Sequence, residues 1–311
     1  MAGCVFGPVP SRRLGRSLGV DLVPLKTCTY DCIYCQLGRT TRKTLERREW
    51  VHLDAVLGEL ESRLSTEPQY ITLSGSGEPT LYSRLGELIA GIKRMTRVPV
   101  AVLTNGSLLG GPEVRAGLLA ADLVIPSLDA GDEKLFQYVN RPHEGVSFEK
   151  MVEGLATFRE EYRGRYWLEV FLLGGVTAIS AEVEKIAAVV RRVNPDRIQI
   201  NTVTRPPAES FAYPVPREEL ERLVALFDGR AEVIAEYRGT HGRSEFAARR
   251  EDVLDLLSRR PCTTGDIAAG LGLHRNEVAK HIEELARDGA VASEAVGDEV
   301  YYRAGTGEPR V

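Results

Sequence analysis

The most informative stretch of the chain is Cys28-Thr29-Tyr30-Asp31-Cys32-Ile33-Tyr34-Cys35, which has C-x3-C-x2-C spacing. Ferredoxins surround an iron–sulfur cluster with four cysteines, because each iron needs a soft ligand beyond its sulfides. Three thiolates at this spacing can hold three corners of a [4Fe–4S] cluster, and an outside molecule can then chelate the remaining iron. The alternatives are a zinc knuckle, three ordinary thiols with no shared ligand, or a catalytic zinc with three thiolates and a water. A structural zinc usually needs a second pair of cysteines, and only Cys4 and Cys262 remain.

A second informative stretch is Ser74-Gly75-Ser76-Gly77-Glu78-Pro79-Thr80, which follows the apolar run Tyr70-Ile71-Thr72-Leu73 and precedes a helical pattern. Alone, a glycine-rich turn from strand to helix indicates a phosphate loop or ordinary turn chemistry. Together and in this order, the two stretches resemble the cysteine motif and the Gly-Gly-Glu-Pro motif of the radical S-adenosylmethionine (SAM) superfamily.

The resemblance implies that Cys28, Cys32 and Cys35 hold a [4Fe–4S] cluster and that the amino and carboxylate groups of SAM take the open iron. It also implies the reaction. The reduced cluster passes one electron to the sulfonium of SAM, and the resulting 5′-deoxyadenosyl radical abstracts hydrogen from a substrate. A reducing partner such as flavodoxin or ferredoxin is then expected.

The same resemblance implies a set of SAM contacts. The backbone of the Gly-Gly-Glu-Pro-like turn would meet the methionine amino group, a Ser-x-Asp pair at a strand end would meet the ribose, and an aromatic residue would lie beside the adenine or cover the cluster. The expected residues are Tyr34, Gly75, Gly77, Glu78, Pro79, Asn105, Ser127 and Asp129.

Two of these residues have simpler interpretations. Asp129 precedes the helix expected near residue 132, so it could be an N-cap. Asn105 stands before Gly106 and could belong to an ordinary Asn-Gly turn. Both alternatives stay open on the sequence alone.

Length and composition suit a globular protein. The chain has 311 residues, 43% of them hydrophobic, and a net charge of −4. No uninterrupted apolar stretch is long enough to span a bilayer, and the start lacks a charged region followed by an apolar one, so we expect a cytoplasmic protein without membrane contact. The five cysteines do not indicate a disulfide framework, and the net negative charge argues against a surface that coats nucleic acid broadly.

Apolar strand patterns alternate with amphipathic helices over the first 240 residues. Repeated β-α units predict a parallel sheet covered by helices, with functional residues at the carboxyl ends of the strands. Periodicity does not distinguish a barrel from an open doubly wound sheet, whereas the resemblance implies a partial (βα)6 barrel over residues 1–245. We expect strands near 17–23, 70–74, 98–103, 122–128, 167–173, 197–201 and 231–235, and helices near 52–65, 81–94, 132–140, 148–163, 180–193 and 216–228.

The pattern changes in residues 246–311. Three helical segments, the last near 274–287, precede a hairpin that turns at 296–299, and this order resembles a winged helix-turn-helix domain. Residues 249–303 carry eight Lys and Arg against eleven Asp and Glu, a net charge of −3. Each phosphate contact needs a cation, so we expect this domain to dock a substrate or partner and not to bind DNA strongly.

Further stretches resemble a narrower group. Residues 6–15, 127–130, 140–143 and 201–207 are similar to radical SAM proteins related to 4-demethylwyosine synthase, which builds a tricyclic guanine in tRNA. That enzyme carries a second cluster on further cysteines near its N-terminus, and Cys4 alone cannot supply one. Its substrate chemistry therefore cannot be transferred to this chain.

Other polar residues have two readings each. Arg141 and Arg205 are candidates to bind a carboxylate or phosphate, with surface ion pairing as the alternative. Glu169 could reach into the barrel, act as an N-terminal cap or stand at a solvated strand end. His241 is interpreted as a loop residue.

Three functions follow as hypotheses. The first is a radical SAM enzyme acting on a macromolecule, a tRNA base or a protein residue, with the winged domain helping to dock it. The second is an activase-like or maturation enzyme that modifies a partner protein. The third is an iron–sulfur transcription regulator that senses redox state, although a regulator has no use for the Glu78-Pro79 turn.

Overall fold

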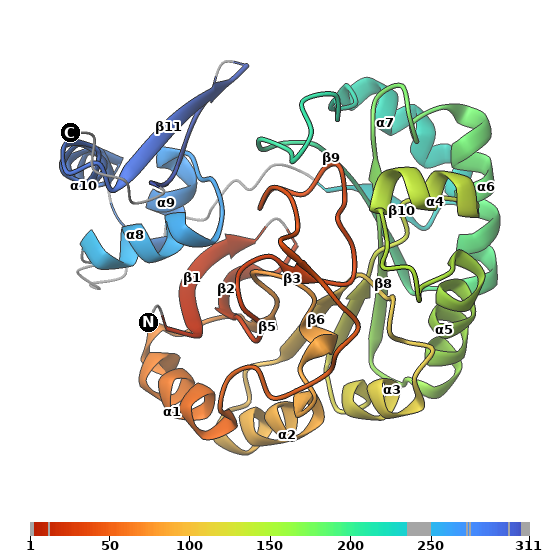
Figure 1. Ribbon diagram of the computed structural model, residues 1–311, viewed down its shortest axis with the longest axis horizontal. Coiled ribbons are helices and arrows are strands. Elements are labelled where there is room, and N and C mark those ends of the chain that lie inside the picture. The colour runs from red at the N-terminus through yellow and green to blue at the C-terminus, as the bar shows by residue number, and fades with distance from the viewer. Residues whose placement is uncertain are drawn as a thin grey trace.

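The computed structural model describes residues 3–11, 13–234, 250–271, 273, 275–297 and 299–305. Its main feature is an eight-stranded sheet in which β1 pairs antiparallel with β2 and all later neighbours are parallel. The sheet curves without closing (Figure 1). In sheet order, the strands are β1 (Val5–Ser11), β2 (Gly15–Val20), β5 (Tyr70–Leu73), β6 (Val100–Thr104), β7 (Leu123–Pro126), β8 (Arg165–Leu172), β9 (Arg197–Thr202) and β10 (Ala231–Val233). The predicted α/β fold of partial-barrel type is confirmed, and the barrel is open.

Helices follow the strands and cover the convex side of the sheet (Figure 1). Their inward faces carry the apolar residues that the sequence periodicity indicated, for example Leu53, Val56 and Leu60 in the first helix. The helices are α1 (Leu53–Arg63), α2 (Leu85–Met95), α3 (Pro112–Leu118), α4 (Glu133–Asn140), α5 (Phe148–Glu161), α6 (Ser180–Val193) and α7 (Arg217–Val224), with short 3-10 helices at Leu64–Thr66, Pro79–Leu81 and Ala225–Phe227.

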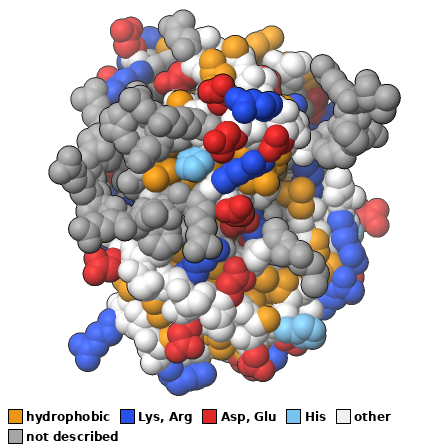
Figure 2. All heavy atoms as spheres, turned by 90° about the vertical axis from the view of Figure 1, so that its left-hand side faces the viewer, with side chains coloured by type: hydrophobic (Ala, Val, Ile, Leu, Met, Phe, Trp, Pro, Cys, Tyr) orange, Lys and Arg blue, Asp and Glu red, His pale blue; other side chains and the backbone are white. Residues whose placement is uncertain are grey.

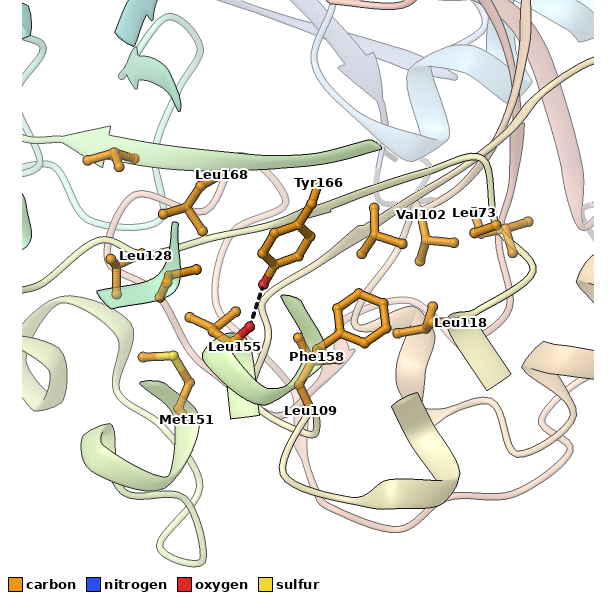
Figure 3. Close-up of a cluster of buried hydrophobic side chains, with 14 of the residues drawn as sticks. Leu73, Val102, Leu109, Leu118, Leu128, Met151, Leu155, Phe158, Tyr166 and Leu168 are labelled. Carbon is orange, nitrogen blue, oxygen red and sulfur yellow. Dashed lines mark hydrogen bonds between the residues drawn. The ribbon is translucent and has the colours of Figure 1, made fainter. Parts of the chain in front are cut away.

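The main core lies between the sheet and these helices (Figure 3). Val102 of β6 and Phe158 of α5 are fully buried there. The Tyr166 hydroxyl in this core donates to the Leu155 carbonyl oxygen at 3.1 Å, so this buried polar group is hydrogen-bonded. Removing a ring such as that of Phe158 from this core should cost about 3 to 5 kcal/mol. The core therefore stabilises the sheet whose strand ends form the site.

Strand β1 is absent from the sequence prediction because Pro8 and Pro10 interrupt its pattern. Proline cannot donate to a ladder and is tolerated mainly on edge strands. Here β1 pairs only with β2 and is the edge of the sheet, with an irregular register between Phe6 and Val9.

Helix α3 is the second element that the sequence prediction missed. It has seven residues, starts with Pro112 at its first position, and buries only Val114 and Leu118. Two apolar positions are too few to establish a helical period, so its boundaries depend on packing against α2.

The C-terminal unit contains the three helices and the hairpin that the sequence predicted: α8 (Arg250–Arg259), α9 (Thr264–Leu271), α10 (Arg275–Arg287), β11 (Val291–Val296) and β12 (Glu299–Ala304). Phe6 and Val9 of β1 belong to the hydrophobic core of this unit, together with Val253, Leu256 and Ile267. It therefore packs directly on the edge strand of the barrel (Figure 1). The expected boundary near residue 245 and His241 both lie outside the described residues.

The surface on this side of the molecule interleaves acidic and basic side chains, with some hydrophobic ones among them (Figure 2). Among the helices that the structure describes, none has the length and apolar character needed to cross a membrane.

Candidate active site

A cavity of about 400 Å³ opens on the concave side of the sheet. Its walls come from the carboxyl ends of the strands, from the cysteine loop and from the C-terminal unit. Of the residues that the sequence singled out, the cavity is lined by Cys28, Cys32, Tyr34, Cys35, Gly75, Gly77, Ser127, Glu169 and Arg205. The structure thus brings the cysteine run and the glycine-rich turn to one site.

Backbone hydrogen bonds shape the cysteine loop. Cys28 ends the short strand β3 (Thr27–Cys28), which pairs with β4 (Arg42–Lys43). The amide of Cys35 donates to the Cys32 carbonyl oxygen at 3.1 Å, and the amide of Ile33 donates to the Val139 carbonyl oxygen at 2.9 Å. The loop is thereby tied both to itself and to the end of α4.

The thiols are in an environment that disfavours a free thiolate. Burial, with the Glu78 charge as a smaller cause, raises the pKa of Cys28 to about 12. Burial likewise raises the pKa of Cys32 and of Cys35. Metal binding requires deprotonated cysteines, so the bound group must bring compensating positive charge, as iron does.

Three cysteine thiols are a donor set that suits a [4Fe–4S] cluster. Within the part of the chain that the structure describes, no three Cys, His, Asp or Glu side chains converge on one point where a metal ion could be held. The charges of Cys28, Cys32 and Cys35 nevertheless act on one another. A [4Fe–4S] cluster takes its cysteines on separate irons, whereas a mononuclear zinc needs them around one centre.

Two asparagine amides point at the cysteine sulfurs. Asn105 Nδ2 lies 3.6 Å from Cys28 Sγ and donates to Thr29 Oγ1 at 2.7 Å. Asn140 Nδ2 lies 3.5 Å from Cys32 Sγ and donates to Asp129 Oδ2 at 2.7 Å. N–H donors favour a sulfur that carries negative charge, so this donor set also suits cluster-bound thiolates. Asn105 does not itself line the cavity.

Glu78 faces the protein interior and not the cavity. Its carboxylate accepts from the Thr80 amide at 3.0 Å, from the Thr80 and Thr104 hydroxyls at 2.6 Å each, and from the Asn105 amide at 2.7 Å. Burial raises its pKa in spite of these bonds. Glu78 therefore ties the glycine-rich turn to the end of β6, and Pro79, also buried, begins the 3-10 helix that follows.

The two glycines of the turn allow close backbone approaches. A side chain at Gly77 would place Cβ 1.7 Å from the Thr27 carbonyl oxygen. Gly75 has φ +153°, and Cβ there would lie 2.7 Å from the Asp21 carboxyl carbon. Asp21 in turn accepts from the amide of Ser76 at 3.1 Å. No other residue type fits these positions without moving the turn.

Ser127 lines the cavity, whereas Asp129 is 3% exposed and lies behind Tyr34 and Phe171. Asp129 accepts from the Tyr34 hydroxyl at 2.5 Å and from the Phe171 amide at 3.2 Å, and burial raises its pKa to about 6. The Tyr34 ring stacks on Phe171 at 4.0 Å. The N-cap interpretation of Asp129 is wrong, because Asp132 caps α4 by accepting from Leu135.

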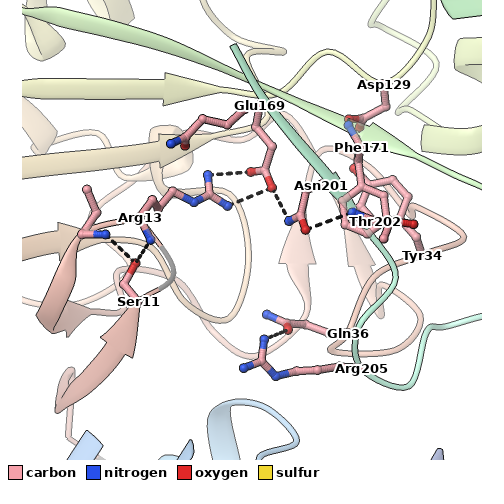
Figure 4. Close-up of polar contacts among 12 residues, drawn as sticks. Ser11, Arg13, Tyr34, Gln36, Asp129, Glu169, Phe171, Asn201, Thr202 and Arg205 are labelled. Atoms are coloured by element: carbon pink, nitrogen blue, oxygen red, sulfur yellow. Dashed lines mark hydrogen bonds and ion pairs between the residues drawn. The ribbon is translucent and has the colours of Figure 1, made fainter. Parts of the chain in front are cut away.

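The cavity holds a polar cluster that the sequence indicated only in part (Figure 4). Arg13 Nη1 and Nη2 donate to the two Glu169 carboxylate oxygens at 2.9 and 2.8 Å, and Asn201 Nδ2 donates to Glu169 Oε1 at 2.8 Å. Glu169 therefore reaches into the barrel, and its interpretation as a solvated strand end is wrong. Its place on the inner face of β8 follows from the alternation of the strand, but no signal in the sequence joined it to Arg13.

The two candidate anion-binding arginines have different surroundings. Arg141 Nη1 lies 2.6 Å from Glu209 Oε1 and 4.0 Å from Asp31 Oδ2, so it joins two loops by ion pairs. Arg205 lines the cavity, where its Nη1 is 3.5 Å from Gln36 Oε1 (Figure 4).

Comparisons with known proteins agree with this geometry. The family model for the radical SAM superfamily matches residues 22–188, and a helix-turn-helix domain model matches residues 250–294. The chain is 36% identical over 267 residues to a UPF0026 protein of Methanocaldococcus jannaschii, covering 82% of each, and 36% identical over 305 residues to one of Helicobacter pylori, covering 96% of each.

A protein of Brachyspira hyodysenteriae named GTPase Obg is 39% identical to this chain over 303 residues. The match covers 96% of this chain but 45% of that protein, so the chain spans less than half the length of that relative. Among solved structures, a radical SAM methyltransferase from Sphaerobacter thermophilus has the same fold, with a TM-score of 0.52 and 18% identity over 70% of this chain and 66% of that one. The chain therefore belongs to the radical SAM superfamily, whose members use a [4Fe–4S] cluster and SAM, and it is an enzyme of that class with a C-terminal helix-turn-helix domain.

Proposed function

We propose that Cys28, Cys32 and Cys35 hold the [4Fe–4S] cluster and that the enzyme abstracts hydrogen from a macromolecular substrate such as tRNA. When bound, the cluster and SAM supply the one-electron cleavage that yields methionine and a 5′-deoxyadenosyl radical. The observation that carries this proposal is the set of three half-buried thiols in the wall of one cavity, two of them facing amide donors.

The other residues of the cavity have supporting roles in this proposal. Gly75, Gly77 and Ser127 line the cavity, and the backbone of the two glycines and the hydroxyl of Ser127 would orient SAM. Glu78, Pro79, Asn105 and Asp129 hold those groups from behind. The apolar lining, which includes Leu103 and Phe171, excludes water from the radical chemistry.

The position of the C-terminal unit favours a large substrate. Arg259 and Arg260 from this unit line the same cavity as the cysteines, so a molecule that enters would meet both parts of the protein. The resemblance of residues 127–130 and 201–207 to proteins related to 4-demethylwyosine synthase makes tRNA a substrate to test, without carrying over the chemistry of that enzyme. The membership in an enzyme superfamily argues against the redox-sensing regulator.

Anaerobic purification and assay test the proposal. We expect a brown protein with about four irons per chain, which cleaves SAM to methionine and 5′-deoxyadenosine when a strong reductant is supplied. Replacing the three cysteines together by Ala should remove the iron, whereas Cys4→Ala should retain it as a matched control. Stoichiometric zinc with no recoverable iron would contradict the proposal.

The substrate needs a separate experiment. Comparing tRNA nucleosides and tryptic peptides from cells with and without the gene would show which macromolecule changes. A missing nucleoside modification would support tRNA, and a changed peptide would instead point to a partner protein.

A further inference from the structure

A basic segment follows the cysteine run and forms part of the cavity wall. Residues 36–48 carry five Lys and Arg against one acidic residue, Glu46, a net charge of +4, although the whole chain has a net charge of −4. The segment returns along the cysteine run, because Lys43 of β4 is the register partner of Cys28 in β3. Its residues in the cavity wall are Gln36, Leu37, Gly38 and Thr40. Positive charge is therefore concentrated beside the cavity.

Two arginines of this segment are held in place while they stay open to solvent. The Cζ atoms of Arg42 and Arg48 lie 4.5 and 3.8 Å from the centre of the Trp50 ring. Their side chains are 46% and 49% exposed. Both pair with Glu46, at 3.0 and 3.7 Å, so one carboxylate serves two cations. A guanidinium that is already stacked on a ring loses little freedom when it binds a phosphate.

The neighbouring cations share a second carboxylate. Arg39 Nη2 and Arg141 Nη1 each lie 2.6 Å from Glu209 Oε1, and the Arg39 side chain is 63% exposed. Lys43, next to Arg42 in β4, donates from Nζ to the carbonyl oxygens of Arg141 and Pro142 at 3.2 Å each. These contacts connect the cations to one another, and we call the group the basic surface. Its five members are Arg39, Arg42, Lys43, Arg48 and Arg141.

Exposed aromatic rings lie beside the basic surface. Phe211 is 38% exposed and Tyr213 is 61% exposed. Their segment is tied to the cysteine loop, because the Glu209 amide donates to the Ile33 carbonyl oxygen at 3.0 Å, and the Ala212 amide closes a turn on the Glu209 carbonyl oxygen at 3.0 Å. The same Glu209 holds two of the cations. Proteins that bind single-stranded nucleic acid combine cations for the phosphates with aromatic rings on which the bases stack.

We infer that the basic surface binds the phosphates of a single-stranded segment of RNA, whose bases stack on Phe211 and Tyr213. The inference deepens the proposed function, because it assigns the substrate to RNA and places its binding surface on the barrel. It rests on that proposal only in treating the bound RNA as the substrate. Residues 36–40 belong both to the basic segment and to the cavity wall, so an unpaired base beside the bound phosphates would lie next to the cavity.

The test measures how tightly the anaerobically reconstituted full chain binds fluorescently labelled RNA at several salt concentrations. The probes are a single-stranded RNA oligonucleotide of mixed sequence, the duplex of the same sequence, and bulk tRNA. We expect the single strand to bind more tightly than the duplex, because only unpaired bases can stack on the rings. The logarithm of the binding constant should fall with the logarithm of the salt concentration, with a slope of about −0.7 for each phosphate contact.

Two kinds of variant separate the cations from the rings. Arg39→Gln should weaken binding and make the salt slope shallower by about 0.7, whereas Arg39→Lys keeps the charge and should restore the slope. Glu209 retains its ion pair with Arg141 in both variants. Phe211→Ala should weaken binding about 5-fold or more and leave the salt slope unchanged, since stacking on this ring releases no counterion.

Each kind of variant has a matched control. Arg287→Gln, at a side chain 70% exposed on α10, and Leu119→Ala, at a side chain 47% exposed after α3, should change neither affinity nor slope. Equal affinity and slope in wild type, Arg39→Gln and Phe211→Ala would overturn the inference. Binding of an acidic ferredoxin through the same cations, with no binding of RNA, would also overturn it and assign the surface to a protein partner.

The inference and the proposed function can fail separately. A protein that contains iron and cleaves SAM but binds neither the single strand nor tRNA would refute the RNA surface and leave the cluster assignment standing. A protein that binds RNA as expected but holds no iron after anaerobic reconstitution would support the RNA surface and refute the cluster assignment.

Discussion

At the scale of single residues, the asparagines beside the cysteines are the least expected feature. Asn105 and Asn140 place amide hydrogens toward Cys28 Sγ and Cys32 Sγ, and Thr29 and Asp129 orient them from the other side. Hydrogen bonds to the sulfurs are one of the factors that determine the potential of an iron–sulfur cluster.

Replacing Asn140 should therefore change the cluster potential. Asn140→Leu removes the donor to Cys32, so the reduced, more negative cluster loses stabilisation and the midpoint potential should become more negative. An anaerobic redox titration followed by electron paramagnetic resonance measures this shift. Asn194→Leu, at the end of α6 and remote from the cysteines, is the control. An unchanged potential in Asn140→Leu would show that the contact with sulfur has no electronic effect.

Glu78 should contribute to the stability of the fold, independently of SAM binding. Glu78→Ala leaves the donors of Thr80, Thr104 and Asn105 without their acceptor in a buried site, and each unsatisfied donor costs about 1 to 3 kcal/mol. The free energy of unfolding, measured in urea, should fall by at least about 3 kcal/mol. Glu78→Gln keeps the shape and should lose less. Equal stability of the Ala variant and wild type would contradict this role.

At the scale of elements, the start of α9 combines a helix cap with a contact between the two parts of the protein. Asp266 accepts from the Thr263 amide at 3.0 Å, and its own amide donates to Thr263 Oγ1 at 3.1 Å, which is a reciprocal capping arrangement. Burial alone would raise the pKa of Asp266, but the Arg205 charge and the bonds from Thr263 lower it overall.

The lowered pKa predicts how stability depends on pH. At neutral pH, Asp266→Ala should reduce the free energy of unfolding by about 1 to 2 kcal/mol through the lost cap. Because the pKa of Asp266 is lower in the folded state than the value near 4 in the unfolded chain, its charge stabilises the folded state at pH values above about 4. This stabilisation disappears as the pH falls through the folded-state pKa. Denaturant unfolding at pH 7 and pH 3 should thus show a difference between wild type and variant that shrinks in acid. A constant difference would mean that the carboxylate charge contributes nothing.

At the scale of the whole molecule, the C-terminal unit and the barrel share structural parts. Phe6 and Val9 of β1 lie in the core of the C-terminal unit. Arg259 stacks over the Phe6 ring at 5.1 Å and pairs with Asp21, which holds the amide of Ser76 in the glycine-rich turn. A path of direct contacts therefore runs from α8 to the cavity wall.

Truncation after residue 234 should accordingly damage the barrel. It exposes Phe6 and Val9 and leaves the buried Asp21 carboxylate without its partner, a loss of roughly 3 to 5 kcal/mol for the charge alone. We expect a lower thermal midpoint and slower uncoupled formation of 5′-deoxyadenosine. Arg259→Gln in the full chain should reproduce part of both effects, and Arg303→Gln, on an exposed position of β12, should reproduce neither. A truncated chain as stable and active as wild type would refute the shared core.

The sequence by itself determined the fold class, most strand and helix positions and the two motifs, because hydrophobic period and the spacing of cysteines and glycines are local properties. Edge strand β1 and helix α3 depended on tertiary packing, since prolines hide the first and the second is too short to show a period. Only the structure decided that Glu78 and Asp129 are buried behind the cavity wall, that Arg13 pairs with Glu169, and that Arg205 pairs with Asp266. These contacts join residues far apart in the chain, so the physical reason is the same for all of them: their energies arise from burial and charge where several segments meet, which no local pattern encodes.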